Sequence, residues 1–278
     1  MENSDLHTHT YYSDGALPPA QVVKLAKEKG IKNLAISDHN SVEGIDEAMK
    51  EAEKLGVNLI PSIEISAEGD EVLGYFIDYK NAKFKKEIKK LQEGSTFSVK
   101  ENIQKAKGKF DINFEELLRE YRPNVSNFNR GHLVRLLIKK GYGDFKEIWP
   151  YFQKGKEFYA EREKISVEGA IKLIKKFGGV PVLAHPWVEL PAKELLKEEN
   201  FAKLVKAGLK GIEIDNGDRD ERRDEKTISR IKEVAKRYNL IITSGSDFHR
   251  EEKNNVHNIG DYNCDEKVVE KLKELKNE

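Results

Sequence analysis

The stretch DLHTHTYYSDG, residues 5–15, places two histidines one residue apart and follows them with an aspartate. Side chains alternate between the two faces of an extended strand, so His7 and His9 point to the same side. Two imidazoles on one face, with Asp14 close behind them, form a donor set that suits a metal ion. The stretch therefore predicts that the first strand of the fold ends at a metal site.

Short apolar runs alternate with helical patterns over most of the chain. Strands are predicted at residues 4–9, 33–37, 57–65, 72–77, 180–184, 211–215 and 240–244. Helices are predicted at residues 18–29, 42–55, 167–177, 192–207 and 220–238. This rhythm predicts an α/β fold with a parallel sheet, and the lack of a glycine-rich dinucleotide motif favours a barrel over an open sheet. Functional groups of such barrels lie at the C-terminal ends of the strands.

The rhythm stops between about residues 80 and 163. This segment reads as mostly helical, with polar turns near residues 94–95, 122–129 and 141–143. We therefore expect a barrel in two parts, residues 1–79 and 164–278, with residues 80–163 inserted as a helical lid domain.

Charge is distributed unevenly between these parts. Residues 79–160 hold 19 Lys and Arg against 10 Asp and Glu, whereas the whole chain has a net charge of zero, so the predicted barrel is acidic. An acidic part can assemble around divalent cations, and a basic part can receive an anionic ligand. Cys264 is the single cysteine, so a metal site must use His, Asp and Glu.

Apolar runs and cysteine content also indicate where in the cell the protein is found. No apolar run is long enough to span a membrane, and the N-terminus lacks the pattern of a secretory signal. With one cysteine there is no intramolecular disulfide, which suits a reducing compartment. We expect a cytoplasmic protein without a membrane partner.

Acidic and histidine residues coincide with the predicted strand ends. Besides the opening stretch, these are Asp38 and His39 in AISDHN, Glu64 in PSIEIS, His185 in VLAHP, and Asp247 and His249 in SGSDFH. Each alone also fits a turn, a helix cap or a satisfied core position. Their coincidence at one rim favours metal binding, with nitrogen and oxygen ligands that suit Zn, Mn or Fe and that outnumber the needs of one ion. Two or three ions are expected, with Glu64 placed to bridge two of them.

The motifs DLHTHTYYSDG, LAISDHN, IEIS, VLAHP and GSDFH, in this order, resemble the PHP (polymerase and histidinol phosphatase) superfamily of metal-dependent phosphoesterases. The similarity continues through LGYFID. It also covers the inserted segment, where NRGHLVRLLIKKGY and IWPYFQKGKEFYAE look like the subgroup that acts on nucleoside 3′,5′-bisphosphates and short RNA 5′ ends. The resemblance spans nearly the whole chain. It implies a distorted (β/α)7 TIM-like barrel of the PHP type and a metal-dependent phosphoric ester hydrolase.

The resemblance also implies ligand groups. One ion is held by His7, His9, Glu64 and Asp247; another by Asp14, His39 and His249; and His185 serves the ion that shares Glu64. Glu64, His185 and His249 are the implied catalytic residues, and the donor of the leaving-group proton stays open between His249, His185 and a metal-bound water.

Two positions depart from the family pattern. Glu71 stands before LGY where the family commonly has a histidine, so it is a candidate carboxylate ligand, and both two and three ions stay open. The segment QEGSTFS, residues 92–98, is expected to interrupt the long arginine-bearing helix that usually opens the insertion.

Phosphate ester hydrolysis needs an activated water and charge neutralisation on the phosphoryl oxygens, which clustered divalent ions supply. Arg130 and His132 in the lid are the candidates for contacting phosphate. The favoured substrate is a small nucleotide of the nucleoside 3′,5′-bisphosphate kind. The alternatives are 5′-to-3′ trimming of short RNA or DNA, a histidinol phosphate or other sugar phosphate, and a regulatory metal-binding module with weak turnover.

Overall fold

The computed structural model describes residues 3–121, 125–161, 164–186, 198–216, 225–250, 257–262 and 264–276. Within these ranges, no helix combines the length and the apolar character that crossing a membrane requires.

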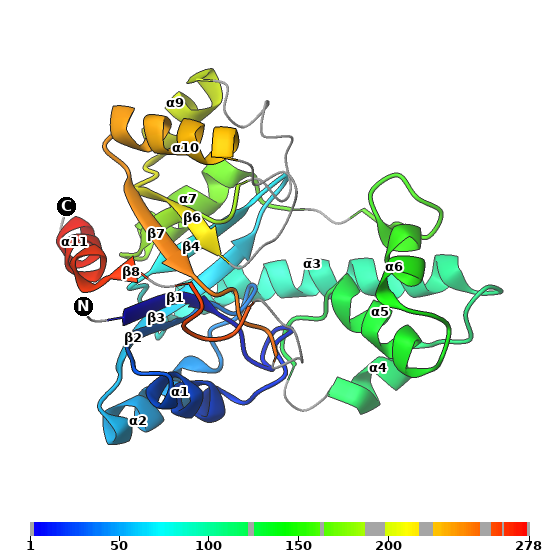
Figure 1. Ribbon diagram of the computed structural model, residues 1–278. Helices are drawn as coiled ribbons and strands as arrows, with labels where there is room; N and C mark the ends of the chain where they lie inside the picture. The colour runs from blue at the N-terminus through cyan, green and yellow to red at the C-terminus, as the bar shows by residue number, and fades with distance from the viewer. Residues whose placement is uncertain are drawn as a thin grey trace.

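An eight-stranded sheet forms the centre of the described structure (Figure 1). Its strands are β1 (Asn3–Thr8), β2 (Ile31–Ile36), β3 (Asn58–Ser66), β4 (Glu71–Tyr75), β5 (Val180–Leu183), β6 (Gly211–Asn216), β7 (Ile241–Gly245) and β8 (Cys264–Asp265), in the order β7-β6-β5-β4-β3-β2-β1-β8. The sheet curves until β1 approaches the end of β7, where the His9 amide donates to the Phe248 carbonyl at 2.8 Å. This nearly closed barrel confirms the predicted fold class.

The prediction of a parallel sheet was wrong for one strand. β4 runs antiparallel to both β3 and β5, and the short β8, which was not predicted, runs antiparallel to β1. Four residues separate Ser66 from Glu71, and a parallel crossover needs a dozen or more. The chain must therefore turn back as a hairpin, which brings Glu71 opposite Ser66 near the end of β3.

Helices cover the outside of the sheet. They are α1 (Pro19–Glu28), α2 (Ile45–Leu55), α7 (Val167–Lys176), α9 (Glu198–Ala207), α10 (Glu225–Arg237) and α11 (Glu266–Lys276). Each buries an apolar stripe: α7, for example, packs Ile171 and Ile174 into a core that also contains Ile63 and Ile212 of the sheet. These helices lie within the predicted segments, apart from α11. Residues 192–197 and 220–224 of two predicted helices lie outside the described residues.

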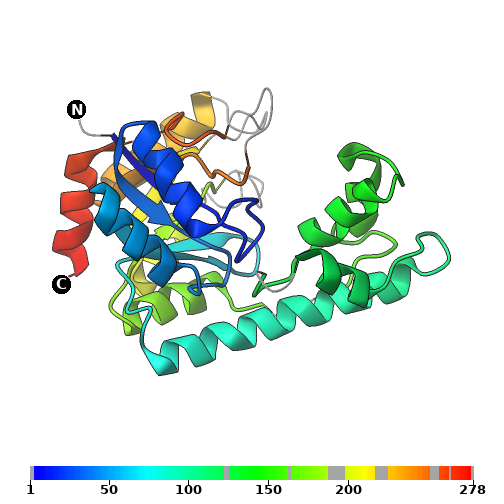
Figure 2. The same ribbon diagram turned by 90° about the horizontal axis from the view of Figure 1, so that it is seen from below.

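The inserted segment is helical, as predicted. It contains α3 (Ala82–Ala106), α4 (Phe114–Tyr121), α5 (Arg130–Lys139), α6 (Phe145–Ile148) and the 3-10 helix η1 (Trp149–Phe152). These elements share a core of their own that includes Phe110, Phe128, Leu133, Phe152 and Phe158. The long helix α3 runs beneath both parts of the molecule (Figure 2). The proposed division at residues 79/80 and 163/164 therefore has one helix that packs into both cores: Phe84 in the barrel and Val99 in the lid.

The predicted turn at residues 94–95 was wrong, because α3 continues through the whole of residues 92–98. Gln92, Ser95 and Ser98 of this stretch are buried, and their side chains have polar partners. The Gln92 amide donates to the Asn40 carbonyl at 2.9 Å, and the Ser98 hydroxyl donates to the Ala160 carbonyl at 3.0 Å. These tertiary contacts offset the weak helix propensity of Gly94 and the serines. The turn at residues 141–143 is present after α5, with Gly141 and Gly143 at positive φ, whereas residues 122–124 lie outside the described structure.

Candidate metal centre

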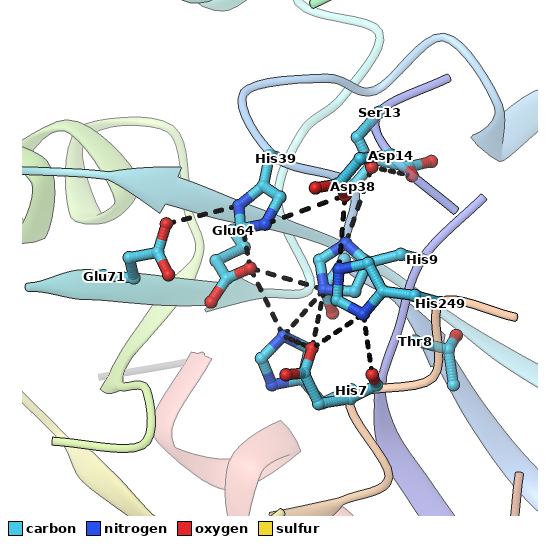
Figure 3. Close-up of polar contacts among 12 residues, drawn as sticks. His7, Thr8, His9, Ser13, Asp14, Asp38, His39, Glu64, Glu71 and His249 are labelled. Carbon is cyan, nitrogen blue, oxygen red and sulfur yellow. Dashed lines mark hydrogen bonds and ion pairs between the residues drawn. The ribbon is translucent and has the colours of Figure 1, made fainter. Parts of the chain in front are cut away.

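The first strand presents its two histidines to one buried point, as the spacing predicts. His7 and His9 are fully buried, and their Nε2 atoms lie 3.1 Å apart (Figure 3). Glu64 Oε2, near the end of β3, lies 3.3 Å from His7 Nε2 and 3.4 Å from His9 Nε2. Asp247 Oδ1 approaches His9 Nε2 to 3.0 Å. Segments far apart in the sequence thus bring four ligand-type side chains to one place.

Asp247 reaches this point from an unusual backbone conformation. Its φ is +50°, in the left-handed region that non-glycine residues other than Asn and Asp rarely adopt. The turn directly after β7 aims the carboxylate back toward β1.

A second group lies beside the first. Asp14 Oδ1 is 3.2 Å from His249 Nε2 and 3.8 Å from His39 Nε2. Together with His9, these residues offer ligand atoms that all lie within 4.8 Å of one another.

A third group forms around Glu71, the residue that stands where the family commonly has a histidine. Glu71 Oε1 lies 3.3 Å from His39 Nδ1, and Glu71 Oε2 lies 3.9 Å from His185 Nε2. Glu64 Oε1 is 3.1 Å from the same His185 nitrogen, and the Ser66 hydroxyl donates to Glu71 Oε1 at 2.9 Å. Glu64 therefore takes part in both the first and the third group.

Unsatisfied buried atoms test whether these residues fit cations. Asp14 Oδ1, His39 Nδ1 and Glu64 Oε2 are buried and form no hydrogen bond of regular geometry among the described residues, although His39 Nδ1 and Glu64 Oε2 lie 3.0 Å apart and Asp14 Oδ1 lies 3.2 Å from His249 Nε2. Buried polar atoms nearly always form regular hydrogen bonds, so three atoms that make only ion-pair contacts in adjoining clusters fit a bound cation. Imidazole nitrogens and carboxylate oxygens at these spacings fit divalent metal ions.

Electrostatics in the centre favour ionised carboxylates. Burial opposes ionisation of Glu64, but the charges of His39 and His7 outweigh it and hold the Glu64 pKa well below its ordinary value. Burial likewise opposes protonation of His185, but Glu64 outweighs it and raises the His185 pKa to about 10. Burial and the neighbouring His249 lower the pKa of His9 to about 4. A binding cation therefore meets ready carboxylates and displaces protons from imidazoles.

Glu213 in β6 was not among the predicted site residues. It is fully buried, and its Oε1 lies 3.1 Å from His7 Nδ1, on the side of the ring away from the centre. Its Oε2 also accepts from the His185 amide at 3.3 Å. A carboxylate on the far nitrogen of a ligand histidine orients the ring and raises its basicity. The available signal was a glutamate between the two isoleucines of the strand GIEID.

Asp38 organises the loop that carries Asp14. It accepts hydrogen bonds from the Thr10 amide at 2.7 Å, the Thr10 hydroxyl at 2.6 Å and the Ser13 hydroxyl at 2.6 Å. Its carboxylate is thereby occupied by the loop, which explains why an aspartate follows β2 without belonging to the three groups.

The lid contacts the same loop from the other side. Asn129 Nδ2 donates to Asp14 Oδ2 at 2.9 Å, and His132 Nε2 lies 2.8 Å from the Ser13 carbonyl. Asn127 Nδ2 donates to the His39 carbonyl at 3.0 Å. Hydrogen bonds therefore connect the region at the start of α5 to the Asp14 loop and to the His39 segment, both of which carry ligand-type side chains.

The two predicted substrate contacts occupy different places. Arg130 lines a cavity of about 280 Å³ that Asp14, His39 and Glu71 also line. His132 is 1% exposed, and its Nδ1 accepts from the Asn129 amide at 3.1 Å. Both of its ring nitrogens thus have protein partners, so its observed contacts are those of a residue that joins the lid to the Asp14 loop.

Comparison with known proteins identifies the family. Residues 5–168 match the family described as the PHP domain. The chain belongs to the PHP family. It is 31% identical over 263 residues to the 5′-3′ exoribonuclease Rnm of Salmonella typhimurium, covering 88% of this chain and 85% of that protein. It is 28% identical over 255 residues to a 3′,5′-nucleoside bisphosphate phosphatase of Chromobacterium violaceum, covering 90% and 88%.

A solved structure supports the fold over the whole length. A Bifidobacterium adolescentis protein, provisionally described as a metal-dependent phosphoesterase, matches with a TM-score of 0.88 at 24% identity, over 99% of this chain and 96% of that one. The PHP resemblance and the prediction of an enzyme are confirmed: the protein is a metal-dependent phosphoesterase of the PHP family.

Proposed function

We propose that this PHP enzyme hydrolyses a phosphate monoester of a small nucleotide, of which a nucleoside 3′,5′-bisphosphate is the representative. One observation carries the proposal: the metal centre and the cationic lid line the same cavity. Asp14 and His39 line it from the barrel, and Arg130, Arg135 and Lys164 also border it. A small anionic substrate would meet both the cations of the centre and the positive side chains of the lid.

The proposed ligand groups follow the three clusters. His7, His9, Glu64 and Asp247 would hold one ion; Asp14, His39 and His249 would hold a second; and His185 and Glu71, together with Glu64, would hold a third. We propose two or three ions, of Mn, Zn or Fe. Bound divalent ions supply a hydroxide near neutral pH and neutralise charge on phosphoryl oxygens.

Arg130 is the proposed phosphate contact. Its NH1 donates to the Phe152 carbonyl at 2.9 Å, and its guanidinium lies 4.8 Å from the centre of the Tyr159 ring. These contacts orient the planar group, and within the described residues its other N–H groups make no hydrogen bond. Such N–H groups can bind phosphate oxygens in pairs.

The proton for the leaving oxygen is proposed to come from His249 or His185. The His249 side chain is 27% exposed, and the His185 side chain is 6% exposed. The greater exposure of the His249 side chain favours His249 as the donor.

A second candidate is 5′-to-3′ trimming of short RNA. Two observations favour it: the Salmonella relative carries the name of a 5′-3′ exoribonuclease, and residues 79–160 hold 19 basic against 10 acidic residues. Nucleic acid backbones bind mainly to such positive surfaces. The two candidates share the chemistry of the centre and differ in the length of the substrate.

The test is phosphate release by the purified protein, chelated and then supplied with Mn. The panel contains a nucleoside 3′,5′-bisphosphate, a nucleoside monophosphate, histidinol phosphate and a 5′-phosphorylated short RNA. We expect the highest kcat/KM on the bisphosphate, and preference for the RNA would favour the second candidate. Preference for histidinol phosphate would overturn the nucleotide assignment, and release from none, with metal bound, would favour a regulatory metal-binding module.

A further inference from the structure

Four side chains of the lid form a continuous stack on the wall of the cavity. The rings of Phe145 and Trp149 lie 5.3 Å apart at an interplanar angle of 15°. The Arg130 guanidinium lies 5.9 Å from the Trp149 ring centre and 4.8 Å from that of Tyr159. All four residues border the cavity that Asp14 and His39 line.

Phe145 does not belong to the lid core. Phe110, Phe128, Phe152 and Phe158 are at most 5% exposed and form that core, whereas Phe145 is 51% exposed and, unlike the similarly exposed Phe97, borders the cavity. Its ring is therefore not used to stabilise that core. An exposed aromatic ring at the mouth of a polar cavity provides a surface on which a planar ligand can stack.

The cavity connects this surface to the metal centre. Its volume of about 280 Å³ is close to the lower end of the range for small-molecule sites, roughly 300 Å³. A phosphate placed beside Asp14 and His39 leaves the rest of the substrate to extend along the lid wall. Of the chemical parts of a nucleotide, the base is the one with a planar π-face that matches an aromatic stack.

The geometry points to Phe145 and Trp149 as a nucleobase subsite of this enzyme. The assignment rests on the proposed function and adds the recognition element that separates nucleotides from other phosphate monoesters. Stacking accepts any base, because every base has a π-face. The subsite thus selects for the presence of a base and leaves its identity open.

The test compares two substrates in matched variants. Adenosine 3′,5′-bisphosphate carries a base, and ribose 5-phosphate does not. We expect Phe145→Ala to lower kcat/KM for the bisphosphate by about fivefold to a hundredfold, the range for loss of one base-stacking contact, and to affect ribose 5-phosphate much less. Trp149→Phe, which keeps a ring next to Arg130, should retain most of the activity. Phe97→Ala is the control, because Phe97 is 61% exposed on α3 and does not border the cavity.

A binding measurement gives a second readout without turnover. The chain has two tryptophans, Trp149 and Trp187, so Trp187→Phe leaves Trp149 as the only indole. In chelator, adenosine 3′,5′-bisphosphate should quench its fluorescence, whereas ribose 5-phosphate should not.

The outcomes distinguish failure of the nucleobase subsite from failure of the proposed function. Equal losses on both substrates in Phe145→Ala, or no loss on either, overturn the subsite and leave the proposed function standing. If the wild type hydrolyses neither compound, the proposed function fails, and the quenching experiment alone decides the subsite: quenching by the bisphosphate supports it, and its absence overturns it.

Discussion

The rim of the barrel and the wall of the lid face the same cavity but are built differently. At the rim, His7, His9 and Glu64 are fully buried, charged or polar, and held by strand ends and by each other. On the lid wall, Arg130, Phe145 and Trp149 come from short helices and are partly or largely accessible.

This difference indicates that the rim and the lid wall have different tasks. Buried carboxylates and imidazoles are costly unless a cation or a partner satisfies them, so the rim is suited to one task, the binding of metal ions. The accessible stack and the cationic side chains of the lid can accept different ligands, which suits recognition. We expect mutations at the rim to abolish turnover and mutations on the lid to change which substrate is preferred.

The most severe test is Asp247→Ala at the rim. Loss of this proposed ligand should lower kcat/KM with Mn by about a thousandfold, equivalent to about 4 kcal/mol of transition-state stabilisation. Glu87→Ala is the matched control, because Glu87 is an exposed acid on α3 that pairs with Lys90. Full activity of Asp247→Ala, in a protein with an unchanged melting temperature, would show that the site assignment is wrong.

A smaller effect is expected behind the rim, from Glu213→Gln. The amide keeps the shape but not the charge that faces His7, so Mn affinity should fall by about tenfold to a hundredfold. Competition against a metal-chelating dye measures this affinity directly. Glu233→Gln, on the exposed face of α10, is the control. Equal affinities in wild type and Glu213→Gln would remove Glu213 from the metal centre.

Arg130→Lys tests whether the lid wall binds the phosphate of the substrate. Lysine keeps the charge but loses the planar fork, so KM for phosphorylated nucleotides should rise by about tenfold, the equivalent of one charge-assisted hydrogen bond. Mn affinity should stay the same, since Arg130 belongs to none of the three ligand groups. Arg119→Lys, at an exposed position of α4, serves as the control. Steady-state kinetics with no change in KM or kcat would exclude Arg130 from substrate binding.

The smallest expected effect is on stability and concerns His132, which joins the lid to the Asp14 loop of the barrel. Burial lowers the pKa of His132 to about 4, so the ring is neutral at pH 7, donates from Nε2 to the Ser13 carbonyl and accepts at Nδ1 from Asn129. Its folded pKa lies below its unfolded value of about 6.5, so its contribution to stability is present above pH 6.5 and is lost as pH falls toward 4.

Between pH 6.5 and 5.5 this loss amounts to about 1 kcal/mol of unfolding free energy. His132→Gln, which does not titrate, should show a correspondingly weaker dependence of urea unfolding on pH over this interval. An identical pH dependence in the two proteins would contradict the assigned protonation state.

Much of the fold could be read from local patterns, because strand and helix periodicity depend on neighbouring residues. The errors have separate causes. The antiparallel direction of β4 follows from the short link after Ser66, a length constraint that outweighs the βα rhythm. The continuity of α3 through Gly94 depends on partners such as Asn40 and Ala160, which are distant in sequence.

The candidate site divides in the same way. His7, His9 and Asp14 lie within one motif, and their chemistry as ligands is a property of the residues themselves, so the sequence by itself predicted a cluster of ligand-type side chains at the rim and which residues form it. Glu213 behind His7 and Asn129 beside the Asp14 loop became apparent only from the tertiary structure, as did the contact of His132, predicted as a phosphate contact, with the Ser13 carbonyl. Their roles depend on which atoms packing brings within hydrogen-bond distance across more than a hundred residues of chain, and no local pattern encodes that proximity.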